Sequence, residues 1–137
     1  MSDEVKLRVY LAGQMRGIPQ FNFPQFHEAA AWLRKEGYHV FNPAEKDAER
    51  HGADFGKDNA TGDEKKAAST GFSLRVALGD DLEWICKHAD GIALLPGWEK
   101  SLGATAERAT AIALGLERLY LHHDVEGWFI TREPHIK

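Results

Sequence analysis

Glu107 is a lone carboxylate in the alanine-rich stretch "GATAERATAIALG". A carboxylate can act as a nucleophile and form a covalent intermediate with a substrate. The stretch predicts a helix, and the positive end of the helix dipole favours the ionised form of Glu107 about one turn inside. The small alanines around it leave room for a ligand. Acids are also common in first helical turns for dipole reasons alone, and the pattern by itself favours that ordinary role.

Asp81 is a second acid that could take part in chemistry, in the stretch "GDDLEWICKHA". Asp81 and Trp84 are three residues apart, so they share one face of the predicted helix. Asp81 could therefore point inward and act as a general acid. The alternative is that Asp80 and Asp81 form a solvated acidic pair on an amphipathic helix, and the pattern alone favours this reading.

Two segments have the residue types that bind anions. Ser101 and the backbone amides of Gly103 and Ala104 stand at a predicted helix N-terminus, where N–H groups and the dipole attract negative charge. The alternative is that Ser101 only caps the helix.

The second segment is "AGQMRGI", in which glycines permit close approach to the backbone and Arg16 could hold a phosphate or carboxylate bidentately. The segment is neither a dinucleotide-binding fingerprint nor a P-loop. A plain turn with a surface arginine is the alternative.

For several other residues, the sequence leaves a functional role open or indicates only a structural one. Trp98 lies in the loop before Ser101 and could stack on a nucleobase or simply cover the sheet edge, and Phe21 and Phe23 raise the same question. Cys86 stands among apolar residues and is expected to be a packed thiol. The seven histidines show no metal-ligand spacing, so no metal site is expected.

The elements that position these residues alternate between strands and helices. Apolar runs predict strands, 3.6-residue periodicity predicts helices, and Gly or Pro marks the ends. Strands are expected over 7–13, 38–43, 90–97 and 117–123, with a further one over 127–133, and helices over 21–37, 72–89 and 103–115. This order predicts a single three-layer α/β domain over residues 1–137, flavodoxin- or Rossmann-like, with a four- to five-stranded, mostly parallel sheet.

In such sheets, ligands bind beyond the carboxyl ends of the strands. Those ends carry "AGQMRG" and "LPGWEKSLGA", so we expect these two distant segments to meet at one crevice. Residues 44–68 are polar, charged and without clear periodicity, which predicts a mobile lid or a partly helical insertion.

Composition excludes some classes of protein. A net charge of −4 lacks the basic character of a nucleic-acid binder. The single cysteine excludes an internal disulfide and fits a reducing compartment. No segment has the length and apolarity of a signal peptide or membrane span. We therefore expect a soluble, cytoplasmic protein with no nucleic-acid or membrane partner.

Taken together, "VYLAGQMRG", "DLEWICKHADGIALL" and "SLGATAERATAIALG" resemble the nucleoside 2-deoxyribosyltransferase superfamily. The resemblance is strongest to its 2'-deoxynucleoside 5'-phosphate N-hydrolase branch and to short bacterial and phage homologues. Each motif is degenerate, but the three stand in the family's order. They frame nearly the whole chain, leaving out 44–68 and the C-terminal tail.

The resemblance implies a role for each matching residue. Glu107 matches the nucleophile, Asp81 the residue that handles the proton of the leaving base, and Ser101 the serine that holds the 5'-phosphate. The other matching residues complete the phosphate cradle or lie on the sugar and base side. The cradle would comprise Arg16, Gly13, Gly17 and Gly103, and the sugar and base side Tyr10, Gln14, Met15, Phe23 and Trp98. Gln14 and Trp98 depart from the family pattern, so the base stays open.

The function that the resemblance implies is an N-glycosidase that cleaves the base–deoxyribose bond of a nucleoside 5'-monophosphate through a glycosyl-glutamate intermediate. No metal and no organic cofactor are expected. The resemblance also implies a homodimer or a larger homo-oligomer. One alternative is a deoxyribosyltransferase that exchanges bases on free deoxynucleosides, and another is a non-catalytic nucleotide-binding module. Deoxyribo or ribo preference stays open.

Overall fold

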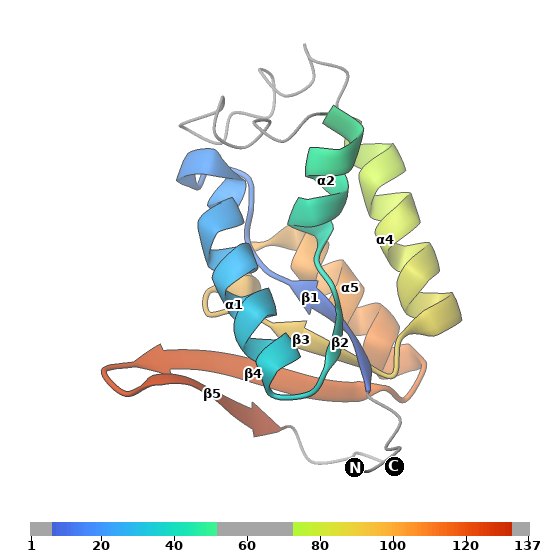
Figure 1. Cartoon of the computed structure of the whole chain (residues 1–137). Coiled ribbons are helices and arrows are strands. Elements are labelled where there is room, and N and C mark those ends of the chain that lie inside the picture. Colours follow the sequence, from blue (N-terminus) through green and yellow to red (C-terminus); the bar gives the residue numbers. More distant parts are fainter. Residues whose placement is uncertain (1–6, 52–72, 133–137) are drawn as a thin grey trace.

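The computed structural model describes residues 7–51 and 73–132. Its centre is a five-stranded sheet in the order β2-β1-β3-β4-β5 (Figure 1). The strands are β1 (Arg8–Ala12), β2 (His39–Phe41), β3 (Gly91–Leu94), β4 (Glu117–Asp124) and β5 (Gly127–Arg132). β2, β1, β3 and β4 run parallel, and β5 pairs antiparallel with β4 through a tight hairpin. The expected mostly parallel α/β sheet is thereby confirmed.

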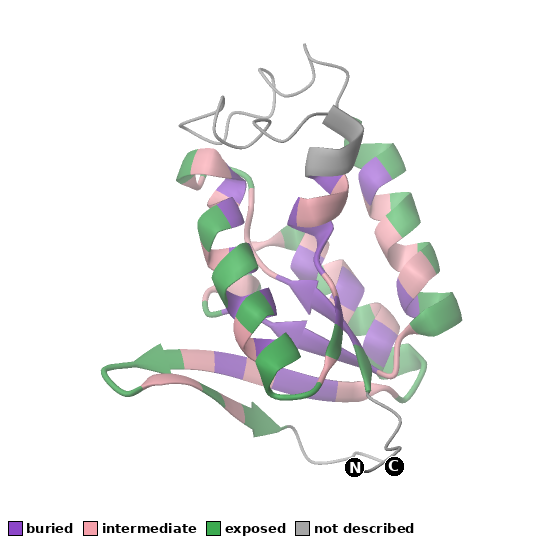
Figure 2. Ribbon diagram, in the orientation of Figure 1, coloured by how far each residue is buried: buried purple, intermediate pink, exposed green. Residues whose placement is uncertain are grey.

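Helices cover both faces of the sheet, which makes three layers. Side chains alternate along β1, so Val9 and Leu11 pack against α1 (Phe23–Lys35) on one face. Tyr10 and Ala12 point to the other face, toward α4 (Leu74–His88) and α5 (Leu102–Ala113). β3 is buried along its whole length because both of its faces are covered (Figure 2).

The first part of the polar region 44–68 is a helix, α2 (Pro43–His51), and residues 52–68 lie outside the described part. Figure 1 shows α2 between α1 and α4, at the end of the sheet where β1 and β2 finish. Residues 43–51 therefore form part of the fold. The lid expected over the remainder stays a prediction.

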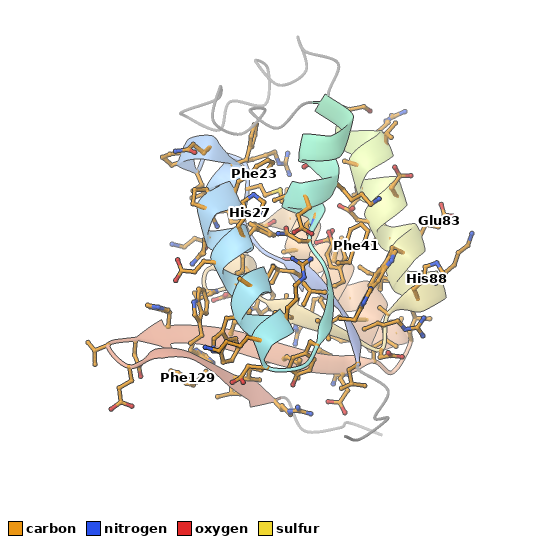
Figure 3. All side chains as sticks on the ribbon, in the orientation of Figure 1. Phe23, His27, Phe41, Glu83, His88 and Phe129 are labelled. Carbon is orange, nitrogen blue, oxygen red and sulfur yellow. The ribbon has the colours of Figure 1, made fainter. Side chains whose placement is uncertain are left out.

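Cys86 is exposed, and the expectation that it is packed was wrong. Its helix, α4, turns Ile85 toward the sheet, and the neighbouring position faces solvent. Glu83, three residues before Cys86, is also exposed and points away from the sheet (Figure 3). Within the described residues, no helix has the length and apolarity to cross a membrane.

Candidate functional site

A cavity of about 470 Å³ lies beyond the carboxyl end of β1. Its wall comes from the end of β1 and the loop after it, from α2, and from the first halves of α4 and α5. This volume falls within the range of small-molecule sites. The loops "AGQMRG" and "KSLGA", distant in sequence, do meet here, as the topology predicted.

Glu107 is a buried carboxyl group in the wall of this cavity, with only 5 % of its surface exposed. It lies on the side of α5 that packs against the sheet, beside Ala104 and Ala111. The Tyr10 hydroxyl, on β1, donates a hydrogen bond of 2.6 Å to its Oε2. β1 and α5 therefore hold this carboxyl group in a fixed place.

Burial raises the pKa of Glu107 from 4.5 to about 8. The Tyr10 hydrogen bond lowers this pKa in part, and the charge of Asp81 raises it. The helix dipole favours the ionised form of Glu107, but burial shifts its pKa in the opposite direction and by more. Desolvation outweighs the dipole because the side chain is directed into the protein and not toward the solvated helix end.

Tyr10 joins the two carboxyl groups of the site. Burial raises its pKa well above the usual value, and the charges and hydrogen bonds of Glu107 and Asp81 raise it further. Its ring stacks on Phe41 at 5.5 Å and packs against Trp84 at 6.5 Å. Sequence reasoning assigned Tyr10 only to the sugar and base side. The alternation of the buried strand could have shown that it points toward Glu107.

The cavity wall also contains groups that can donate to an anion. Ser101 caps α5, because its Oγ accepts a 3.0 Å hydrogen bond from the Ala104 amide. The capping role that the sequence left open is thus present, and Ser101 also lines the cavity with Gly103, Arg16 and Lys100. A side-chain hydroxyl that accepts from Ala104 still has its own proton to donate.

Gly13 permits a close approach between the loop after β1 and β3. A Cβ atom at Gly13 would lie 2.8 Å from Leu95 Cδ1, so only glycine fits there. The next residues, Gln14, Met15 and Gly17, also line the cavity. The glycine in this motif therefore serves packing as well as access for a ligand.

Three consecutive non-glycine residues after this loop have left-handed backbone. Gln20, Phe21 and Asn22 have φ values of 57°, 53° and 63°. Asn22 Nδ2 donates a 3.0 Å hydrogen bond to the Gln14 carbonyl oxygen, which ties this turn to the loop after β1. Such backbone is costly and is found where the surrounding structure over-determines it, often beside functional sites. Phe21 lines the cavity, and sequence reasoning gave no sign of this geometry.

Phe23 and Trp98 are the two expected site residues that the structure does not place in the cavity wall. Phe23 is the first residue of α1 and is buried in the core. Trp98 packs against Tyr120 at 6.0 Å, and the Arg108 guanidinium lies 5.0 Å from its ring centre. Of the two readings of Trp98, the contacts favour a cover over the sheet.

Asp47 on α2 also lines the cavity and is only 6 % exposed. Sequence reasoning missed it because it lies in the region expected to be an insertion. Ala44 and Asp47 are buried and three residues apart, a helical spacing that could have marked this face. In the described residues, no group of three or more His, Cys, Asp or Glu side chains is arranged to hold a metal ion.

Comparisons with known proteins give one family. No curated protein and no solved structure matches the chain. A family described as "Domain of unknown function (DUF4406)" matches residues 7–120, a range that includes every residue of the cavity wall and crosses 44–68. Because this match covers most of the chain, the protein belongs to the DUF4406 family.

Proposed function

We propose that the protein is an N-glycosidase that releases the base from a nucleoside 5'-monophosphate, with 2'-deoxyribose as the sugar that the sequence resemblance suggests. The observation that carries the proposal is the buried carboxyl group of Glu107, held at 2.6 Å by Tyr10 inside a cavity with an anion-binding end. A buried, positioned carboxylate beside a second carboxyl group is the arrangement that glycosidic bond cleavage uses.

The substrate would lie with its 5'-phosphate at the start of α5. Ser101, the Gly103 amide and Arg16 supply the donors there, and the helix N-terminus favours a doubly charged group. Glu107 lies further along the same helix, where it would face the sugar. Binding energy from the phosphate, remote from the reacting bond, would position C1' for attack.

The reaction would proceed in two steps. An ionised Glu107 oxygen attacks C1' while the C1'–N bond breaks, and Asp81 gives the leaving base its proton, directly or through a water. Water then attacks C1' of the glycosyl ester, and Asp81 takes a proton from that water as the Glu107 carboxylate leaves. The products are the free base and the sugar 5-phosphate.

The two carboxyl groups would share one proton between them. With a pKa of about 8, Glu107 would be mostly protonated at neutral pH, beside Asp81. Tyr10 interacts with both groups. When its hydroxyl turns to donate to Asp81 and accepts from protonated Glu107, a proton can pass from Glu107 to Asp81. That transfer produces a nucleophilic Glu107 and an acidic Asp81, the pair of states that the first step needs.

The test is incubation of the purified protein with deoxynucleoside and ribonucleoside 5'-monophosphates, with release of free base measured by chromatography. We expect release without an added acceptor base, and loss of at least a thousandfold in Glu107→Gln. Glu126→Gln, an exposed acid at the β4–β5 hairpin, is the matched control and should keep full activity.

Intact-mass spectrometry of the quenched reaction adds a direct measure, because the intermediate carries the mass of one sugar phosphate on the protein. Full activity in Glu107→Gln would overturn the assignment of the nucleophile. Release that needs an acceptor base and ignores the 5'-phosphate would favour base exchange instead. Tight nucleotide binding without any turnover would favour a binding module.

A further inference from the structure

We propose that Trp84 is a positioning residue of the site and that it acts through Tyr10. Its indole holds the Tyr10 ring in the orientation in which the hydroxyl meets both Glu107 and Asp81. This inference rests on the function proposed above, because the orientation matters for the proton that the two carboxyl groups would share. Trp84 is not one of the described residues that line the cavity, so contact with a substrate does not explain its place.

The contacts of the Tyr10 hydroxyl depend on how its ring is held. Two torsions place the O–H group, because χ1 swings the whole ring and χ2 turns the plane in which the O–H bond prefers to lie. The hydroxyl donates to Glu107 Oε2 at 2.6 Å and also interacts with Asp81. A hydrogen bond weakens steeply when its angle leaves the favourable range. A tilt of the ring would therefore weaken the contact with one carboxyl group or the other.

Two aromatic rings support the Tyr10 ring. Phe41 stacks on it at a centroid distance of 5.5 Å with 23° between the planes, and Trp84 lies 6.5 Å away with 43° between the planes. Phe41 and Trp84 also contact each other, with 4.8 Å between their centroids. The three rings form one cluster, to which β1 contributes Tyr10, β2 contributes Phe41 and α4 contributes Trp84.

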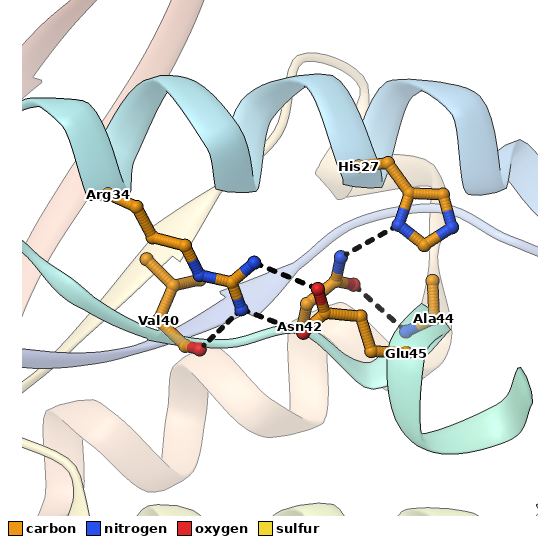
Figure 4. A network of polar contacts seen from close by, with 6 residues as sticks. All are labelled: His27, Arg34, Val40, Asn42, Ala44 and Glu45. Carbon is orange, nitrogen blue, oxygen red and sulfur yellow. Dashed lines mark hydrogen bonds and ion pairs between the residues drawn. The ribbon is translucent and has the colours of Figure 1, made fainter. Parts of the chain in front are cut away.

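Phe41 is held by the sheet and by contacts of the residues on both sides of it. Its backbone pairs with β1 in the parallel register of the sheet. On one side, the Val40 carbonyl oxygen accepts a hydrogen bond from Arg34 Nη2 at 3.0 Å (Figure 4). On the other side, the Asn42 side chain accepts from the Ala44 amide at 2.9 Å. Because these contacts pin the backbone around it, Phe41 forms a fixed wall of the cluster.

Trp84 belongs to the helix that also carries Asp81. The two residues are three positions apart, so they lie on the same face of α4. Of the fifteen residues of α4, only Ala77 and Ile85 are buried, and the half-buried indole packs against the core on this face of the sheet. The indole therefore ties the Tyr10 ring to the helix that holds one of the two carboxyl groups.

The cluster also borders a second hollow, of about 220 Å³. Trp84 and Phe41 line it together with charged side chains such as Glu83 and Lys87, and it shares no lining residue with the larger cavity. The indole thus contacts Tyr10 and also borders this hollow. A side chain without a ring at position 84 would leave space beside Tyr10 into which its ring could tilt.

A double-mutant cycle tests whether Trp84 acts through the Tyr10 hydroxyl. Base release is measured for Trp84→Met, in which a flexible chain fills part of the space, for Tyr10→Phe and for the double variant. We expect Trp84→Met to lower kcat about tenfold and to leave KM within about twofold of the wild type, because the indole does not line the cavity. In the Tyr10→Phe background, the same substitution should change kcat by less than about twofold.

Two further variants separate this role from a merely structural one. Trp84→Phe should keep kcat within about threefold of the wild type, because an aromatic ring can still pack against Tyr10. Trp32→Met is the matched control. Trp32 is a half-buried tryptophan of α1 that packs against the core on the opposite face of the sheet, so its replacement should leave kcat unchanged.

A measurement without substrate keeps this inference apart from the proposed function. Carbon-13 NMR of the Glu107 carboxyl group follows its titration. The pKa of Glu107 should rise in Trp84→Met, because the Tyr10 hydrogen bond that lowers this pKa is weakened. The pKa should stay at the wild-type value in Trp32→Met.

Additive effects of Trp84→Met and Tyr10→Phe on kcat would overturn the positioning role and leave the glycosidase in place. So would a Glu107 pKa that Trp84→Met does not change. If the wild type released no base, the glycosidase would be overturned, and the Glu107 titration would still decide the role of Trp84. If Trp84→Met does not fold, Phe41→Leu takes its place in the cycle, because Phe41 supports the same ring, and additive effects there would count equally against the inference.

Discussion

At the scale of single residues, the unusual feature is a buried acid whose pKa is raised enough to favour its uncharged form at neutral pH. Glu107 is the residue on which the proposed chemistry depends, and burial has already shifted its pKa to about 8. A group with such a shift in a cavity is a candidate for acid–base or nucleophilic work. The same shift in pKa lowers the free energy of unfolding at neutral pH. This effect can be measured without any substrate.

Replacement of Glu107 by glutamine should stabilise the protein at neutral pH. The folded-state pKa of this acid is raised, so the folded protein holds its proton while the unfolded chain loses it above pH 4.5. Wild-type stability contributed by this group therefore falls as pH rises from 4.5 to 8. At pH 7, the free energy of unfolding of the wild type should therefore be about 3 kcal/mol lower than that of Glu107→Gln.

Denaturant or thermal unfolding at pH 4 and pH 7 measures this effect. Glu107→Gln should be more stable than wild type at pH 7 and similar at pH 4, because the glutamine can still accept from Tyr10. A variant that is less stable at both pH values would show that Glu107 is not a desolvated acid.

Tyr10→Phe should change both the rate and the pH dependence. With one proton shared by two carboxyl groups, base release should follow a bell-shaped pH profile that falls above about pH 8, where that proton is lost. The Tyr10 hydrogen bond lowers the pKa of Glu107, so its removal should move the descending limb to higher pH and reduce kcat about tenfold or more.

Tyr120→Phe is the control for the loss of a phenol, because the Tyr120 hydroxyl accepts from Arg108 Nε at 2.9 Å, away from the cavity wall. Its pH profile should match that of the wild type. An unchanged descending limb in Tyr10→Phe would contradict the shared-proton arrangement.

At the scale of elements, the first turn of α5 combines a structural and a binding role. Ser101 caps the helix, and the same helix end lines the cavity, where we propose that it binds the phosphate. The loop after β1 shows a similar combination, because Gly13 lets this loop pack on Leu95 while it lines the cavity. A substitution that retains the structural role and removes the binding role can separate the two.

Ser101→Asp should retain the cap and abolish phosphate binding. Aspartate is as good a cap as serine, so stability should stay near the wild-type value, whereas Ser101→Ala should lose about 1 kcal/mol. The new negative charge repels a 5'-phosphate, and KM for nucleoside monophosphates should rise at least tenfold. KM for the free nucleoside should not rise. A parallel increase for both substrates would place the phosphate elsewhere.

Gly13→Ala should destabilise the protein by about 1–3 kcal/mol, because its Cβ would overlap with Leu95 side-chain atoms 2.8 and 2.9 Å away. Gly79→Ala is the matched control. Gly79 lies inside α4 with open space around it, so alanine there should stabilise by about 0.5–1 kcal/mol. Unfolding in denaturant measures both, and equal effects would contradict the close approach at Gly13.

At the scale of the whole molecule, the outer side of α5 has an uncharged stripe. Leu102, Thr105, Ala109 and Ile112 are all exposed and follow helical spacing, and Leu102 is 80 % exposed. A two-fold interface places a surface against its own copy, so an uncharged surface meets itself without repulsion. For the homodimer that the sequence resemblance implies, this stripe is the contact that we predict.

Ala109→Glu should therefore convert a dimer to a monomer, because it sets like charges opposite each other. Ala31→Glu, at an exposed position of α1, is the matched control and should leave the mass unchanged. Light scattering after size-exclusion chromatography gives the mass directly. A wild-type monomer, or a dimer that persists in Ala109→Glu, would contradict this contact.

The alternation of strands and helices was readable from the sequence because apolar periodicity reflects which faces are buried. The sheet over β1, β2, β3 and β4, the helices α1, α4 and α5, and the meeting of the loops after β1 and β3 all followed from it. The sequence resemblance anticipated Glu107, Asp81 and Ser101 as site residues, and all three line the cavity, whereas local pattern alone favoured an ordinary role for both acids.

Tertiary structure alone decided what surrounds each of these residues. The neutral state of Glu107 depends on desolvation by segments distant in sequence, and the placement of Trp98 over Tyr120 depends on the pairing of β3 with β4. Asp47 entered the cavity wall because α2 is held against α1 by contacts such as Arg34–Glu45. Burial and tertiary contacts depend on residues that are far apart in the sequence. Local sequence pattern therefore determines the elements and their buried faces, but not the electrostatics of the site between them.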